Sequence, residues 1–168
     1  MKLFVLFASF VVATSAVAAD PGRPLLLRGW EFTVPVFLEQ KVHDGPDFTV
    51  TYLSSDEKKM GMGIYEGGFP QEASKGRPRV TREDDNIAGQ KVSWVLWDEE
   101  TDGLKRVSFE VFLAVNPERA SSDKFHLFGY ASSTADLNLL RSIVRSAHRK
   151  EAANHPTEPL SPSRGGSS

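Results

Sequence analysis

The sequence predicts an α+β fold: an antiparallel β-sheet of about five to seven strands with an amphipathic C-terminal helix packed on one face. The first observation is the stretch 91–113, where two runs of alternating apolar and polar residues flank a polar connection ending at Gly103. That alternation is typical of a β-hairpin with one buried face. The second is the recurrence of apolar residues at helical spacing from Leu137 to Ala147, after Ser133, a favourable helix cap. A chain of 168 residues suits one domain.

Residues 1–19 have the features of a signal peptide. Lys2 gives a positive start, an almost unbroken apolar run follows from Leu3 to Val12, and small residues surround Ala18. The run is shorter than the roughly 20 residues that span a bilayer, which disfavours an uncleaved anchor. We therefore expect cleavage after Ala18 or Ala19, no later transmembrane segment, and a periplasmic or extracellular location.

The composition narrows the class of protein. The absence of cysteine excludes disulfides, thiol chemistry and a cysteine-linked lipid anchor, and no asparagine begins a glycosylation signal. Both features favour a bacterial exported protein. Loss of Lys2 with the signal peptide changes the formal net charge from −2 to −3, and this balance gives no electrostatic basis for binding nucleic acid. We expect no cofactor.

After the signal peptide, residues 20–30 are predicted to be a lead-in segment that lies against the core through its leucines. Alternation then predicts strands at residues 30–38, 47–53 and 59–66. Pro35 indicates that the strand at 30–38 lies at a sheet edge or contains a bulge, because proline cannot donate a hydrogen bond to a neighbouring strand. In the last of these strands Gly61 and Gly63 share a face, which indicates either a bend or something packed closely over that face. We favour a helix there over a ligand.

Residues 67–90 form the longest irregular stretch, and loops of this length are often functional. Only a short edge strand, at Val80 and Thr81, is expected within it. Clustered cations beside an aromatic side chain suit a protein partner or an anionic surface, although the acidic residues 83–85 partly neutralise them. The candidate binding residues are Phe69, Lys75, Arg77, Arg79 and Arg82.

A last strand at residues 125–131 leads into the helix, which the pattern extends to Lys150. The arginines at 141, 145 and 149 are interpreted as the solvated side of this helix. Residues 151–168 are rich in proline, serine, glycine and alanine without apolar periodicity, which predicts a disordered tail. The single α+β domain is therefore expected at residues 31–150.

The order of these elements resembles the PsbP-like sandwich proteins over roughly residues 32–148. The resemblance is one of pattern: a glycine-rich strand at 63–65, a long loop, a tryptophan-bearing central hairpin, and a last strand that feeds the amphipathic helix segment 139–146. It implies a non-enzymatic accessory or assembly role. Fold alone does not fix function, so the residues themselves carry the argument.

The acidic turn of the hairpin is a candidate metal site. Asp98, Glu100 and Asp102, followed by Gly103, match the first half of a calcium-binding loop. The closing position is Phe109, which has no carboxylate, and strands flank the turn where helices are expected. A solvated hairpin turn is the simpler interpretation, and a calcium-stabilised module is an alternative.

No catalytic constellation is visible in the sequence. The histidines lack metal-ligand spacing, and His126 is expected to point away from the core as an ordinary surface histidine. No Gly-x-Ser-x-Gly elbow occurs. The sequence therefore favours an exported, non-catalytic binding or assembly accessory protein that uses the 67–90 loop as its contact surface. The alternative is a small hydrolase or metal-dependent enzyme whose site is assembled from distant residues.

Overall fold

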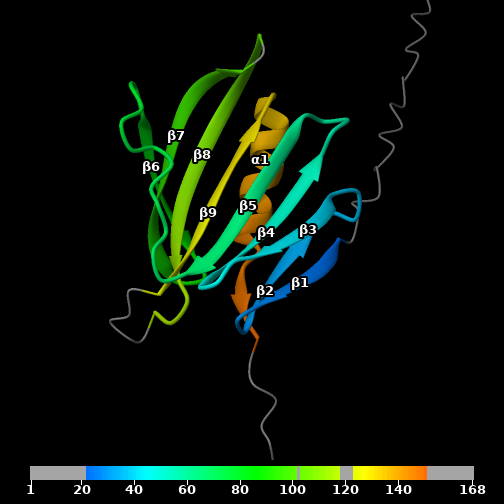
Figure 1. Cartoon of the computed structure of the whole chain (residues 1–168), viewed down its shortest axis with the longest axis vertical. Coiled ribbons are helices and arrows are strands. Elements are labelled where there is room, and N and C mark those ends of the chain that lie inside the picture. The colour runs from blue at the N-terminus through cyan, green and yellow to red at the C-terminus, as the bar shows by residue number, and fades with distance from the viewer. Residues whose placement is uncertain (1–21, 102, 118–122, 151–168) are drawn as a thin grey trace, which may run out of the picture.

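The protein has an α+β fold, as the sequence predicted (Figure 1). The computed structural model describes residues 22–101, 103–117 and 123–150. The expected signal peptide at 1–19 and tail at 151–168 lie outside the described residues. None of the helices in the described ranges has the length and apolar character needed to cross a membrane.

A seven-stranded sheet and a three-stranded sheet, both antiparallel, form the framework together with one helix, α1 (Thr134–Arg145). The large sheet has the strand order β3-β4-β5-β9-β8-β7-β6, and the small sheet has the order β1-β2-β10. The strands of the large sheet are β3 (Glu39–Asp44), β4 (Phe48–Ser55), β5 (Met60–Gly67), β6 (Thr81–Ile87), β7 (Gln90–Thr101), β8 (Leu104–Ala114) and β9 (Lys124–Ala131). Those of the small sheet are β1 (Arg23–Leu27), β2 (Trp30–Val34) and β10 (His148–Arg149).

The predicted hairpin at 91–113 is confirmed as β7 and β8, the two longest strands, and β8 pairs on its other side with β9. Trp94 and Phe109 are fully buried on one face of this hairpin, with their ring centroids 5.5 Å apart. The strands predicted at 47–53, 59–66 and 125–131 are confirmed as β4, β5 and β9. Regular alternation over long runs is the reason that these elements could be predicted.

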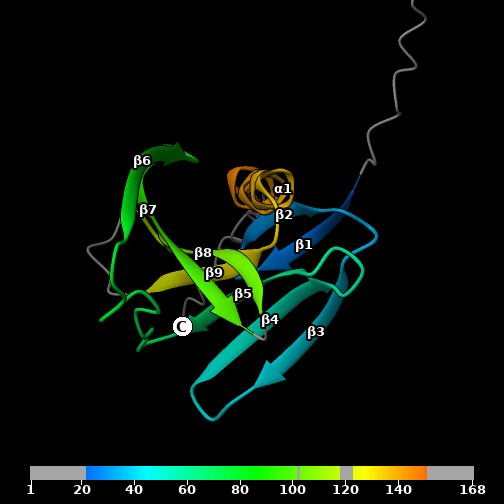
Figure 2. The ribbon, with the colours of Figure 1, turned by 90° about the horizontal axis from the view of Figure 1, so that it is seen from above.

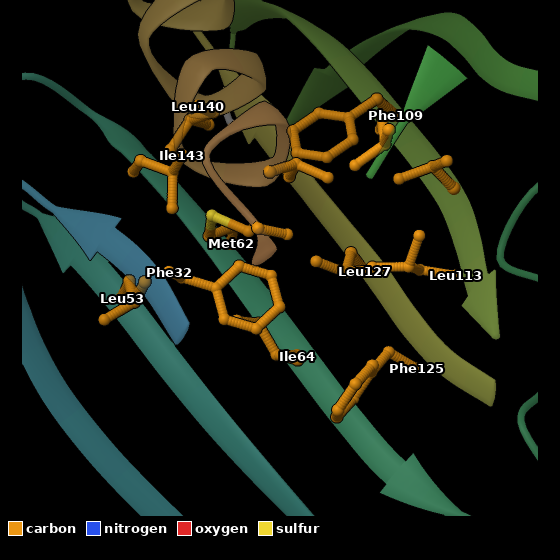
Figure 3. Packing of buried hydrophobic residues seen from close by; sticks show 14 of the residues in the cluster. Phe32, Leu53, Met62, Ile64, Phe109, Leu113, Phe125, Leu127, Leu140 and Ile143 are labelled. Carbon is orange, nitrogen blue, oxygen red and sulfur yellow. The ribbon is translucent and has the colours of Figure 1, made fainter. Parts of the chain in front are cut away.

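The core lies between the large sheet on one side and α1 with the small sheet on the other (Figures 1 and 2). Leu140 and Ile143 of α1 lie close to Met62 of β5 (Figure 3). Phe32 of the small sheet meets Phe125 of β9 edge to face, with centroids 6.0 Å apart. Burial of these apolar surfaces is the main stabilising contribution in a chain without cysteine.

The helix begins where the cap predicts and ends earlier than expected. The hydroxyl of Ser133 accepts a hydrogen bond from the backbone N–H of Asp136 at 3.1 Å, which confirms the predicted cap. The prediction that the helix runs to Lys150 is wrong, since α1 ends at Arg145 and residues 148–149 pair with β2 as β10. This pairing closes the small sheet, which the local helical pattern could not reveal.

The expected lead-in segment at 20–30 is instead part of the domain. Residues 23–27 form β1, which pairs with β2 along its whole length, so Leu25 is buried beside Phe32 while Leu26 is half exposed. Arg28 and Gly29 join the two strands with φ values of 46° and 80°. Two central residues with positive φ are the geometry of a type I′ hairpin turn. The strand could not be predicted because the three consecutive leucines show no alternation of apolar and polar residues.

The strand predicted at 30–38 is interrupted at Pro35. β2 ends at Val34, and a turn follows in which the N–H of Leu38 donates to the carbonyl of Pro35 at 3.2 Å. The chain then forms β3, an edge strand whose residues are all exposed and which the sequence analysis did not predict. Charged and polar residues are a common property of edge strands because they discourage sheet-to-sheet association.

The 67–90 stretch is not one loop, because residues 81–87 form the edge strand β6. A two-residue turn at Ala88 and Gly89, with φ values of 49° and 80°, connects β6 to β7. Of the short strand expected at Val80 and Thr81, only Thr81 belongs to this longer element. The irregular segment that remains, residues 68–80, is called the cover loop below.

The arginines of α1 are not merely its solvated side. Glu83 of β6 accepts from Arg141 at 2.5 Å, and Asp85 accepts from Arg145 at 2.8 Å and from the indole of Trp94 at 3.0 Å. These contacts tie the edge strand to the helix. They also direct Glu83 and Asp85 toward the helix face, so neither neutralises cations on the other face of the sheet.

Candidate functional site

The face of the large sheet opposite α1, called the open face below, carries the candidate site. Directly paired residues of antiparallel strands share a face. The register therefore places Tyr52, Gly63 and Phe128 in one row across β4, β5 and β9. Val50, Tyr65 and His126 form the next row.

The two glycines of β5 belong to the open face, so the expectation that a helix covers them is wrong. The residues that alternate with them, Met60, Met62 and Ile64, point into the core with α1. The side chains over the glycines come from β9. A Cβ atom at Gly63 would lie 2.5 Å from Cζ of Phe128, and one at Gly61 would lie 3.5 Å from the ring of Tyr130. Glycine at 63 lets the Phe128 ring lie against the strand, since a Cβ there would make that ring shift.

An aromatic hollow of about 580 Å³ opens on this face between β4 and the cover loop. This volume lies within the range of about 300–1,000 Å³ that is usual for small-molecule sites. The hollow is lined by the side chains of Phe48, Tyr52, Tyr65, Phe69 and Phe128, together with Asp47, Val50, Gln71, Glu72, Ala73 and His126. The rings of Phe48 and Tyr65 stack with centroids 5.6 Å apart.

A second hollow of about 310 Å³ adjoins the first and shares Tyr52 and Phe128 with it. Gly61, Gly63 and Gly129 contribute to its lining, and Tyr130 forms another part. The guanidinium of Arg106 lies 4.6 Å from the centroid of the Tyr130 ring. The two hollows together give the open face a continuous aromatic depression along β4, β5 and β9.

The buried carboxylate of Glu110 fixes the cover loop to the sheet. Its side chain is 1% exposed, and it accepts hydrogen bonds from the backbone N–H groups of Ala73 at 2.7 Å and Ser74 at 3.3 Å. The hydroxyl of Ser74 donates to the same carboxylate. Buried carboxylates are tolerated when donors satisfy their oxygens in this way. The loop is therefore held at one defined place by contacts with β8.

His126 is buried and belongs to the same cluster, so the prediction that it is a surface histidine is wrong. Its Nε2 lies 3.0 Å from Oε2 of Glu110, and its ring stacks on Phe112 with centroids 4.5 Å apart. Burial lowers the pKa of His126, although the nearby carboxylates of Glu110 and Glu72 oppose this shift. A neutral imidazole with its hydrogen on Nε2 donates to Glu110 and lines the hollow.

Ser74, Glu110 and His126 do not form the relay of a serine hydrolase. The hydroxyl of Ser74 donates to Glu110 and not to His126, whereas nucleophilic catalysis requires the base to be bonded to the nucleophile. The order of contacts suits a structural role, in which one carboxylate gathers donors from the loop and from β9.

The predicted binding residues are divided between two parts of the open face. Phe69 is 81% exposed and lines the aromatic hollow. The cations lie beyond the hollow: Arg77 is 5.8 Å from the ring centroid of Trp97 and 3.5 Å from Glu99, and Lys75 and Arg79 are exposed. Arg82 lies on β6 opposite Val95, and so faces the same side as Trp97.

The proposed calcium ligands are separated from this site. Asp98 and Glu100 lie on β7 and border a shallow hollow next to Ser133 at the start of α1. Asp102 falls outside the described residues. Within residues 22–101, 103–117 and 123–150, no group of three or more histidine, aspartate or glutamate side chains could hold a metal ion. The calcium-stabilised module stays a prediction.

The Glu110–His126 pair was missed, yet the sequence contains a signal for it. Glu110 interrupts an apolar run between Phe109 and Val111, and His126 interrupts another between Phe125 and Leu127. A charged residue within such a run deserves a search for its partner, because burying it alone is costly. Sequence could not supply the register that brings the two residues together.

Neither a protein-family model nor a curated protein matches this chain. Its function is therefore inferred from the geometry of the open face.

Glu110→Gln is expected to release the cover loop. The amide keeps one acceptor oxygen and adds two donors where the neighbours also donate, so we expect the free energy of unfolding to fall by about 2–4 kcal/mol. Limited trypsin digestion measures the loop itself: cleavage after Lys75 or Arg79 should become about ten-fold faster. Glu57→Gln, at an exposed carboxylate on the β4–β5 turn that does not contact the cover loop, is the matched control. Wild-type cleavage rates in Glu110→Gln would contradict the role assigned to this carboxylate.

The neutral state of His126 predicts a pH dependence of stability. Its folded pKa is lowered from 6.5, so below that pH the unfolded chain takes up a proton more readily than the native protein. The free energy of unfolding should therefore be fully retained well above pH 6.5 and should fall as the pH drops below 6.5 toward the lowered pKa of the native state. Chemical denaturation at several pH values measures this slope.

The slope should be smaller in His126→Gln, which has no imidazole to protonate. It should persist in His148→Gln, because His148 is exposed. Equal slopes in the wild type and in His126→Gln would show that another group causes the pH dependence.

Proposed function

We propose that this chain is an exported, non-catalytic binding or assembly accessory protein whose contact surface is the open face of the large sheet. The observation that carries the proposal is the aromatic hollow, an open concave surface beside the highly exposed Phe69. Concave surfaces lined by aromatic side chains with a few polar groups are the usual form of ligand sites.

Rigidity of the surroundings supports a binding role. The floor of the hollow belongs to the central strands, and Glu110 anchors the wall that the cover loop provides. Binding is stronger when the site is already ordered, because fewer side chains lose conformational freedom on association. Phe69 is the exception, since its side chain projects into solvent and is free to close over a bound group.

A small hydrolase or metal-dependent enzyme is the alternative. It is favoured by one observation, that His126 lines the hollow while bonded to a carboxylate. The orientation of Ser74 away from His126 favours the binding role instead. A calcium-stabilised module is a second alternative, which depends on Asp98, Glu100 and Asp102.

Export is part of the proposal and rests on the sequence of residues 1–19, with its basic start, apolar run and small residues near Ala18. The resemblance to PsbP-like sandwich proteins agrees with an accessory role.

A photo-reactive benzoylphenylalanine placed at position 69 is expected to cross-link to the physiological ligand or partner in the exported fraction. The same group at position 26, where Leu26 is 53% exposed on β1, is the matched control and should give little product. Tyr52→Ala should reduce cross-linking from position 69 by about ten-fold. Aromatic residues at the centre of an interface commonly contribute about 1 kcal/mol or more to the binding free energy.

Mass spectrometry of the products distinguishes the outcomes. A specific product from position 69 that depends on Tyr52 supports the open face as the contact surface. Equal labelling from positions 69 and 26, or labelling that Tyr52→Ala leaves unchanged, would contradict the proposal that the open face is the contact surface.

Amino-terminal sequencing of the exported protein tests the localisation. The mature chain should begin at Ala19 or Asp20. Leu6→Arg places a charge within the apolar run, and we expect that variant to remain inside the cell with Met1 or Lys2 as its first residue. Exported protein that still carries the apolar run from Leu3 to Val12 would contradict the predicted cleavage. Normal export of Leu6→Arg would contradict the assignment of residues 1–19 as a signal peptide.

A further inference from the structure

We propose that the aromatic hollow binds an organic cation, that is, an ammonium group carrying methyl or larger alkyl substituents. The inference rests on the proposed function, because it names the ligand class for the same surface. Three properties of the hollow carry it: the number of rings, the sign of the charges in its lining, and the pairing of two nearby cations with carboxylates.

Five aromatic residues from four parts of the chain converge on the hollow. They are Phe48 and Tyr52 of β4, Tyr65 of β5, Phe69 of the cover loop and Phe128 of β9. The face of an aromatic ring has a negative electrostatic potential, so a cation within about 6 Å of a ring centroid is attracted to it. Several rings around one cavity form the kind of cage that recognises quaternary ammonium groups.

The charges of the lining have one sign. Asp47 and Glu72 contribute carboxylates, and among the described residues that line the hollow there is neither lysine nor arginine. His126 adds no positive charge at neutral pH, because burial lowers its pKa. An anionic ligand would meet two carboxylates there, whereas a cation would find both rings and compensating charge.

Two cations near the hollow are engaged with carboxylates of their own. Arg77 pairs with Glu99 at 3.5 Å beyond the cover loop. Lys41, opposite Tyr52 on β3 and in the lining of the adjoining hollow, pairs with Glu39 at 3.8 Å. Both pairs reduce the repulsion that a cationic ligand would experience. The protein also carries native examples of the contact, such as Lys58 located 5.0 Å from the ring centroid of Phe37.

A pair of probes of equal shape isolates the charge. Choline carries a trimethylammonium group, and 3,3-dimethyl-1-butanol carries the uncharged tert-butyl group in its place. Titration of the full chain, followed by ¹H–¹⁵N NMR, should show saturable shifts at residues of the hollow with choline. The neutral alcohol should bind at least about ten-fold more weakly, as expected for loss of one to two cation–π contacts.

Two variants with matched controls locate the site. Tyr52→Leu should weaken choline binding by about five- to thirty-fold, while Phe37→Leu, at an equally exposed aromatic side chain elsewhere, should not change it. Glu72→Gln should weaken binding by about two- to five-fold, and this loss should shrink at high salt. Glu57→Gln, an exposed carboxylate on the β4–β5 turn, is its control. Unchanged melting temperatures confirm that all four variants fold.

Two results would overturn the inference. One is equal affinity for choline and for the alcohol, which would identify the hollow as a site for neutral apolar groups. The other is the absence of saturable binding of choline up to about 10 mM, a concentration at which even a weak site is occupied. Neither result affects the cross-linking test at position 69, so failure of the ligand class and failure of the contact surface can be told apart.

Discussion

The open face depends on one buried carboxylate, that of Glu110. Its oxygens accept from two consecutive backbone N–H groups of the cover loop, from the hydroxyl of Ser74 and from the ring of His126. An ionised group with so little exposure would be strongly destabilising without these donors. The same contacts set the height of the loop above the sheet. The wall that the cover loop gives to the aromatic hollow is therefore held in place by the donors that Ala73 and Ser74 supply to this buried carboxylate.

The cover loop divides the open face into regions of different chemistry. Its first part places Phe69 and Glu72 at the aromatic hollow, and its second part carries the exposed cations beyond Trp97. Of the acidic residues 83–85 of β6, only Asp84 shares a face with Arg82. Glu83 and Asp85 turn to the other face and bind the helix arginines. Neighbours in sequence thus serve different faces, because successive residues of a strand alternate in direction.

The accuracy of prediction varies with the position of each strand in the sheet. The hairpin at 91–113, the strand at 125–131 and the capped helix start at Ser133 follow from apolar periodicity and cap chemistry. The edge strand β3 was not predicted, and β6 was predicted only at its first residue, since the polar residues of both strands lack the pattern that burial imposes. Edge strands are polar in order to avoid association with other sheets. Apolar periodicity in the sequence is therefore least informative for the strands at the edges of a sheet.

The sequence by itself determined the α+β class, the central hairpin and the helix start, because each rests on contacts between residues close in the chain. It also placed Phe69 among the candidate binding residues. Only the tertiary structure decided that the glycine face is open, that β10 closes the small sheet, and that His126 meets Glu110. Those features depend on the register between strands, and register is fixed by packing across the whole sheet, which no local pattern contains.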